Sequence, residues 1–223
     1  MTPPSLRDVL HAGPLPPDVA AAALALAHAA AGSLDALGDV YREALGIGVP
    51  IDVLREGALS AHLFCGFPRA IEAFRRLDEA AGGLAEPVDE PDSGKGFSGK
   101  SLFERIYGEQ AAPVRGILRR FHPVLEEAVL EDAYGRILAR PRLEARTREL
   151  LAVCALTAGR LPLQLESHLR GALRCGAALK DVRAAVELGG LVGGAEAARD
   201  GMALLARLGP ARDDSGPGAG RAP

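Results

Sequence analysis

The sequence has no tryptophan and few other aromatic residues, with three Tyr and six Phe among 223 residues. Its apolar residues are mainly Ala, Leu and Val, which favour closely packed helices over a sheet with an aromatic core. No apolar run reaches the roughly 18 residues that a membrane-spanning helix needs. The N-terminus also lacks the basic flank and apolar stretch of a signal peptide. We therefore expect a cytoplasmic protein that does not bind membranes.

The sequence also lacks a strong excess of either charge and any cluster of cysteines. A net charge of −3 gives no electrostatic basis for binding nucleic acid. Cys65, Cys154 and Cys175 are too few and too scattered for a disulfide framework, and no two have the spacing of a CxxC pair. No two histidines have metal-ligand spacing. The sequence therefore predicts neither a metal nor a cofactor.

Helical periodicity runs through most of the chain, and no segment alternates in the manner of a strand. Glycine and proline interrupt the pattern and set the expected helix ends. We expect an all-α fold with helices over about 18–31, 33–45, 51–65, 68–81, 101–109, 112–121, 123–138, 145–159, 161–176, 179–192 and 195–208.

The chain resembles itself after a shift of 128 residues. Residues 42–77 align with 170–205 without a gap, and nine positions are identical, among them the pairs Gly48/Gly176 and Gly66/Gly194. Such repetition predicts two tandem copies of one helical unit. The expected division is an N-terminal arm (1–17), a first, degenerate repeat (18–80), a linker (81–100), a second repeat (101–207) and a disordered tail (208–223).

At the end of the linker, GKGFSGKS (94–101) formally matches the phosphate-binding P-loop pattern. A P-loop follows a buried strand, whereas the preceding EPVDEPDS is acidic and broken by proline. Ser101 and Glu104 instead predict a capping box at the start of a helix. We therefore interpret the glycines as linker residues and expect no nucleotide site here.

The best candidate site is the pair Glu149 and His168 in the second repeat. Glu149 lies about ten residues before the turn at 159–162, and His168 about eight residues after it. At ~1.5 Å per residue, the two side chains can meet at similar heights on antiparallel helices. A carboxylate that orients an imidazole forms a general acid/base pair. The alternative is a structural histidine, and the aligned first-repeat residues, Ala21 and Val40, could form no such pair.

Residues 134–188 resemble the carboxymuconolactone decarboxylase family of the alkylhydroperoxidase D-like (AhpD-like) superfamily. The resemblance rests on Gly135, Arg140-Pro141, the pattern Arg146-x-Arg148-x-Leu150, and the pattern His168-x-x-x-Ala172-Leu173-x-x-Gly176. It implies an AhpD-like all-α fold whose subunits associate into a homo-oligomer, commonly a trimer or a hexamer.

The resemblance implies two possible chemistries. The peroxidase branch uses E-x11-C-x2-C-x3-H, but Leu161 and Gln164 stand at its cysteine positions, so no peroxidase activity is expected. The decarboxylase branch implies His168 as proton donor and acceptor, oriented by Glu149. Arg140, Arg148 and Gln164 are then candidates for substrate binding, although Gln164 replaces an acidic residue usual in that branch.

Together these features predict a cofactor-free lyase that acts on a small carboxylated or lactone substrate. The alternative is a non-catalytic, oligomeric helical relative that serves as a binding or scaffold protein.

Overall fold

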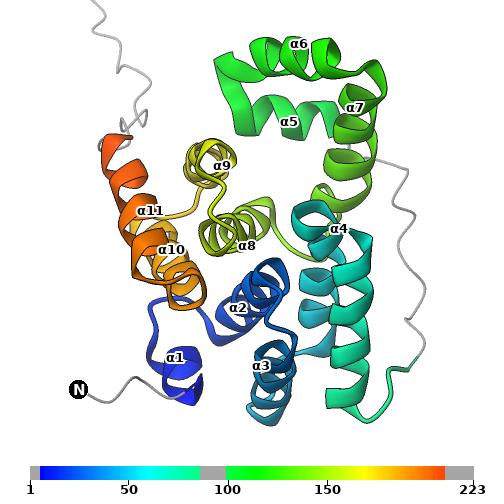
Figure 1. Cartoon of the computed structure of the whole chain (residues 1–223), viewed down its shortest axis with the longest axis vertical. Coiled ribbons are helices and arrows are strands. Elements are labelled where there is room, and N and C mark those ends of the chain that lie inside the picture. The colour runs from blue at the N-terminus through cyan, green and yellow to red at the C-terminus, as the bar shows by residue number, and fades with distance from the viewer. Residues whose placement is uncertain (1–5, 86–98, 209–223) are drawn as a thin grey trace, which may run out of the picture.

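A computed structural model of the protein describes residues 6–85 and 99–208. Every regular element in these residues is a helix, which confirms the all-α fold class (Figure 1). The elements are α1 (Leu6–Ala12), α2 (Pro17–Ala31), α3 (Leu34–Gly46), α4 (Ile51–Ala81), α5 (Gly99–Tyr107), the 3-10 helix η1 (Gly108–Gln110), α6 (Ala111–Phe121), α7 (Pro123–Ala128), the π-helix η2 (Val129–Leu138), α8 (Ala145–Ala158), α9 (Pro162–Arg174), α10 (Leu179–Gly193) and α11 (Ala195–Arg207). None of these helices combines the length and apolarity needed to cross a membrane.

Helix α8 lies at the centre of the molecule, packed against α2, α9 and α10 (Figure 1). Every residue from 148 to 158 is buried, as the apolar sequence of this helix predicts. Small residues bring the neighbouring helices close to it. At Gly189 of α10, for example, a Cβ atom would lie 2.5 Å from the carbonyl oxygen of Cys154. The centre of the fold therefore depends on Ala and Gly rather than on aromatic side chains.

Helix α4 is bent where the sequence predicts that one helix ends and another begins. Gly66 has φ 84° and ψ 163°, a conformation that favours glycine, and Pro68 follows in the next turn. Gly194, between α10 and α11, has nearly the same conformation, with φ 91° and ψ 170°. Because Gly66 and Gly194 are aligned by the shift of 128 residues, this match supports the tandem repeat, which stays a prediction.

The start of α5 differs from the one predicted from the sequence. Of GKGFSGKS, residues 94–98 lie outside the described residues. Helix α5 begins at Gly99, so Ser101 lies within the helix and the predicted capping box is wrong. A Cβ atom at Gly99 would lie 2.1 Å from the carbonyl oxygen of Leu130, so this glycine allows α5 to pack closely on η2.

A buried ion-pair cluster joins α4 to the start of α8. Arg140, in the loop after η2, donates to Glu56 at 2.8 Å, and Arg148 of α8 donates to it at 2.6 Å. Glu56 and Arg148 are 4% and 2% exposed. Burial alone would raise the pKa of Glu56, but the hydrogen bonds and charges of the two arginines outweigh it and hold that pKa below its ordinary value.

Replacing Glu56 with glutamine should lower the free energy of unfolding by about 3–5 kcal/mol at neutral pH, because the buried guanidinium groups lose their carboxylate. The lowered pKa means that this stabilisation is present above about pH 4.3, the ordinary pKa of glutamate, and is lost as the pH falls through the lowered value. The difference between wild type and Glu56→Gln, measured by urea unfolding, should therefore shrink in acid.

The control is Glu72→Gln, because Glu72 pairs with Arg75 on the surface, at 2.8 Å. Equal losses of stability in the two variants, or a Glu56→Gln effect that does not change with pH, would contradict the account.

Candidate functional site

Glu149 and His168 meet across the α8–α9 hairpin. His168 Nδ1 lies 3.0 Å from Glu149 Oε2, and the two residues are 8% and 1% exposed. An ionised carboxylate can only accept hydrogen bonds, so Nδ1 donates. In the neutral imidazole, Nε2 is then unprotonated and able to take up a proton. The spacing in the sequence correctly predicts the contact, and it says nothing about the pocket beside it.

The contact requires a glycine on α9. A Cβ atom at Gly171 would lie 2.4 Å from Glu149 Oε2 and 2.7 Å from Cγ2 of Ile106. Gly171 therefore leaves the space into which the Glu149 carboxylate extends to reach His168. The other carboxylate oxygen, Oε1, is buried and has no hydrogen-bond partner among the described residues.

His168 lines a cavity of about 490 Å³ between α9, α4 and the segment from the end of α5 to η2. The lining is mostly aliphatic and aromatic, and the polar side chains in it are Gln164, Ser167, His168 and two tyrosines. The full set of lining residues is Leu63, Phe64, Tyr107, Val114, Ile117, Leu118, Phe121, Val129, Ala133, Tyr134, Leu138, Leu156, Leu161, Leu163, Gln164, Ser167 and His168. The cavity is thus an apolar pocket of small-molecule size with few polar groups.

The first half of the chain contributes to this cavity through α4. Leu63 and Phe64, just before the bend at Gly66, are among the lining residues. The Phe64 ring meets the His168 imidazole edge-on, with centroids 5.9 Å apart and planes at 72°. The bend in α4 therefore places an aromatic wall beside His168.

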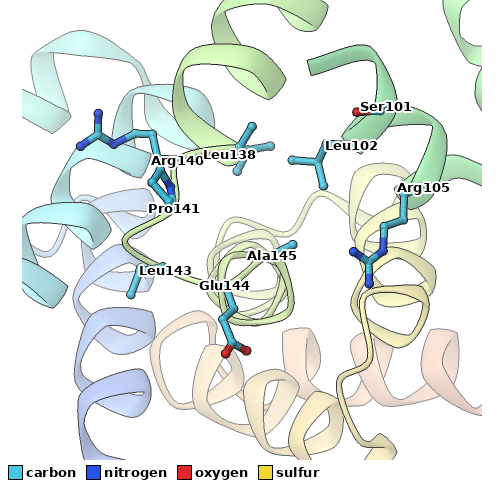
Figure 2. A pocket seen from close by; sticks show the side chains of 10 residues that line it. Ser101, Leu102, Arg105, Leu138, Arg140, Pro141, Leu143, Glu144 and Ala145 are labelled. Atoms are coloured by element: carbon cyan, nitrogen blue, oxygen red, sulfur yellow. The ribbon is translucent and has the colours of Figure 1, made fainter. Parts of the chain in front are cut away.

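The structure does not bring Arg140 and Arg148 to the cavity that His168 lines. Both guanidinium groups pair with Glu56, and Arg148 is almost fully buried. Arg140 borders a different cavity, of about 530 Å³, between α5 and the loop before α8, and its side chain extends towards α4 (Figure 2). Two of the three residues predicted to bind substrate, Arg140 and Arg148, therefore have a structural role as partners of Glu56.

Gln164 does line the cavity with His168, as does Leu161. These are the two positions at which the peroxidase branch has cysteines. Cys154 is fully buried in the core and Cys175 is 7% exposed. Burial raises the pKa of Cys175 to about 11, so this thiol is protonated at neutral pH. No group of three or more potential metal ligands occurs in the described parts of the chain.

Sequence reasoning missed Phe64, Tyr107 and Tyr134. Phe64 enters the cavity from a helix more than eighty residues away in the sequence, and no local pattern indicates that contact. The tyrosines lie in two amphipathic segments, Tyr107 in α5 and Tyr134 in η2, and the pattern of neither segment indicates a site. One available signal was their rarity, because the chain has three tyrosines in all.

Substituting Gly171 with alanine should push the Glu149 carboxylate away from His168, since the new methyl group would occupy its position. We expect a loss of about 1–3 kcal/mol in the free energy of unfolding, the usual effect of overpacking. Urea unfolding measures this loss. Gly116→Ala is the control, because nothing lies within 4 Å of a Cβ atom there; if Gly171→Ala were as stable as Gly116→Ala, the close contact would be refuted.

The comparisons with known proteins support the family resemblance of the segment that contains the α8–α9 hairpin. Residues 126–207, from α7 to the end of α11, match the family model described as Carboxymuconolactone decarboxylase family. The chain is also similar to Peroxisomal protein 2 of Schizosaccharomyces pombe, at 28% identity over 172 residues, which cover 72% of this chain and 78% of that protein. The chain therefore carries a carboxymuconolactone decarboxylase family domain over residues 126–207.

Proposed function

We propose that the protein is a cofactor-free acid/base enzyme, in which His168 moves a proton at a carbon atom of a small lactone or related carbonyl compound. The observation that carries the proposal is the hydrogen bond between Glu149 and His168, placed at the wall of a half-open, largely apolar cavity. A carboxylate–imidazole pair in such a place is a common arrangement for proton transfer.

The roles of the two side chains follow from their geometry. Glu149 holds the imidazole by Nδ1, so Nε2 is the atom that exchanges protons with a bound molecule. Glu149 can keep this hydrogen bond when His168 carries a second proton, because both ring nitrogens of the imidazolium are donors. Glu149 is therefore the positioning residue and His168 the residue that meets the substrate.

A decarboxylation at this site would use His168 as the acid. The bond between the carbon atom and the carboxylate breaks, carbon dioxide leaves, and the electron pair passes into an enolate. The imidazolium then gives its proton to the carbon atom, and His168 is reprotonated by water. A simple isomerisation would use the same groups in the opposite order, with Nε2 first removing a proton from carbon.

The lining of the cavity favours recognition of the lactone group of a substrate over recognition of a carboxylate group. No Arg or Lys is among the lining residues that the structure describes, and Arg140 and Arg148 pair with Glu56 instead. The substrate should therefore be mainly apolar, with Gln164 and Ser167 available as hydrogen-bonding groups. We propose the same cavity as the ligand site if the protein is instead a non-catalytic binding protein.

The experiment is a comparison of wild type with His168→Ala and Glu149→Gln on a panel of lactones with and without a carboxylate group. Product formation and uptake of solvent deuterium at carbon are followed by NMR. His168→Ala should lower the rate by about 100-fold or more, the usual contribution of a general acid or base. His11→Ala, at an exposed histidine of α1, should leave it unchanged.

Equal rates in wild type and His168→Ala would refute the proposed role of His168. Binding of the lactones by wild type without turnover or deuterium uptake would favour the non-catalytic alternative. The homo-oligomeric state and the cytoplasmic location stay predictions, which native mass measurement and imaging of a tagged protein would test.

A further inference from the structure

The cavity beside His168 contains a second polar feature, a pair of tyrosines. Tyr107 ends α5 and Tyr134 lies in the middle of η2, and both line the cavity with His168. Their side chains are hydrogen-bonded to each other. The remaining tyrosine, Tyr41, is buried in the main hydrophobic core and is not among the residues that line this cavity.

The tyrosine rings are held in place by Phe103, which is fully buried. Its ring centroid lies 4.3 Å from that of Tyr107 and 4.9 Å from that of Tyr134, the second contact being edge-on. Both phenols are therefore fixed before any ligand enters, which is the property that effective hydrogen-bond donors in active sites share.

The two hydroxyl groups are not equivalent. Tyr134 is 3% exposed, whereas Tyr107 is partly exposed and also borders a neighbouring surface cavity. Burial raises the pKa of both phenols, and their mutual hydrogen bond lowers that of Tyr107 and raises that of Tyr134. Because Tyr107 is the less buried of the two and lines the cavity, its hydroxyl group is the one that a bound molecule can reach.

Glu149 is not the acceptor for either hydroxyl. Its Oε2 bonds to His168, and its Oε1 has no hydrogen-bond partner in the described part of the chain. Glu149 nevertheless lies close enough to raise the pKa of both phenols by its charge, after the larger effect of burial. Both phenols therefore stay protonated at neutral pH and can act as donors.

We propose that the Tyr107–Tyr134 pair binds the oxygen atom of the ligand, with the Tyr107 hydroxyl donating to a carbonyl oxygen that becomes an enolate oxygen as His168 acts on carbon. This deepens the proposed function, on which it rests, by naming the substrate class: a planar, mainly apolar carbonyl compound. The protein would then separate two tasks, since His168 moves the proton while the phenol pair stabilises the negative charge on oxygen.

The test uses two probes of similar size and shape. 2-Naphthol carries an acidic hydroxyl group on a planar apolar frame and stands in for an enol. 2-Methylnaphthalene has a methyl group in place of that hydroxyl. Wild type should bind 2-naphthol about tenfold more tightly, since a tenfold ratio corresponds to about 1.4 kcal/mol, the size of one good hydrogen bond.

Tyr107→Phe should bring the ratio of the two affinities close to one while leaving the affinity for 2-methylnaphthalene unchanged, because the ring and its contact with Phe103 remain. Tyr134→Phe should lower the ratio by less. Tyr41→Phe, the control, should keep the wild-type ratio. In His168→Ala the preference for 2-naphthol should persist, since the hydroxyl group is held by the tyrosine pair.

The proposal is overturned if wild type shows no preference for 2-naphthol, or if Tyr107→Phe keeps it. A preference that disappears in His168→Ala and survives in Tyr107→Phe would assign the oxygen to the histidine instead. A Tyr107→Phe variant that binds both probes equally weakly would reduce the tyrosine to a structural role, and thermal unfolding would identify that case. These readouts are binding ratios, so they are independent of the turnover assay that tests His168.

Discussion

The burial of α8 is the constraint on which the rest of the structure depends. From residue 148 onwards, packing against α2, α9 and α10 leaves α8 no access to water, and yet the charged residues Arg148 and Glu149 are adjacent there. A buried charge is costly unless a partner compensates it. Each therefore has its own partner on a different element: Arg148 pairs with Glu56 of α4, and Glu149 with His168 of α9.

These two pairings have different consequences. The Glu56 cluster joins the first half of the chain to the family domain and lies away from the cavity that His168 lines. The Glu149–His168 pair instead fixes an imidazole at the wall of that cavity, with Nε2 free of the carboxylate. Two neighbouring residues of α8 thus serve different purposes: Arg148 joins the helix to α4, and Glu149 holds His168, because the helix directs their side chains to different neighbours.

Much of this organisation could be predicted from the sequence, for identifiable reasons. Helical periodicity and the glycine and proline breaks gave the helix positions, including the bend at Gly66. Rise per residue on a hairpin predicted the Glu149–His168 contact, because both residues lie in one local unit. The roles of Arg140 and Arg148 could not be predicted in this way, because their partner Glu56 lies more than eighty residues away. Phe64 is also far from His168 in the sequence, so their contact could not be predicted either. The capping box predicted at Ser101 is wrong because α5 begins two residues earlier.

Glu149 fixes His168 with Nδ1 protonated and Nε2 available to the cavity. The most direct measurement is the ¹⁵N NMR spectrum of the imidazole nitrogens in histidine-labelled protein at a pH where His168 is neutral, with His168→Gln to assign its signals. We expect a protonated Nδ1 and an unprotonated Nε2 in wild type, and a shift of this balance in Glu149→Gln. A protonated Nε2, or two tautomers in rapid exchange as in a free imidazole, would contradict this assignment.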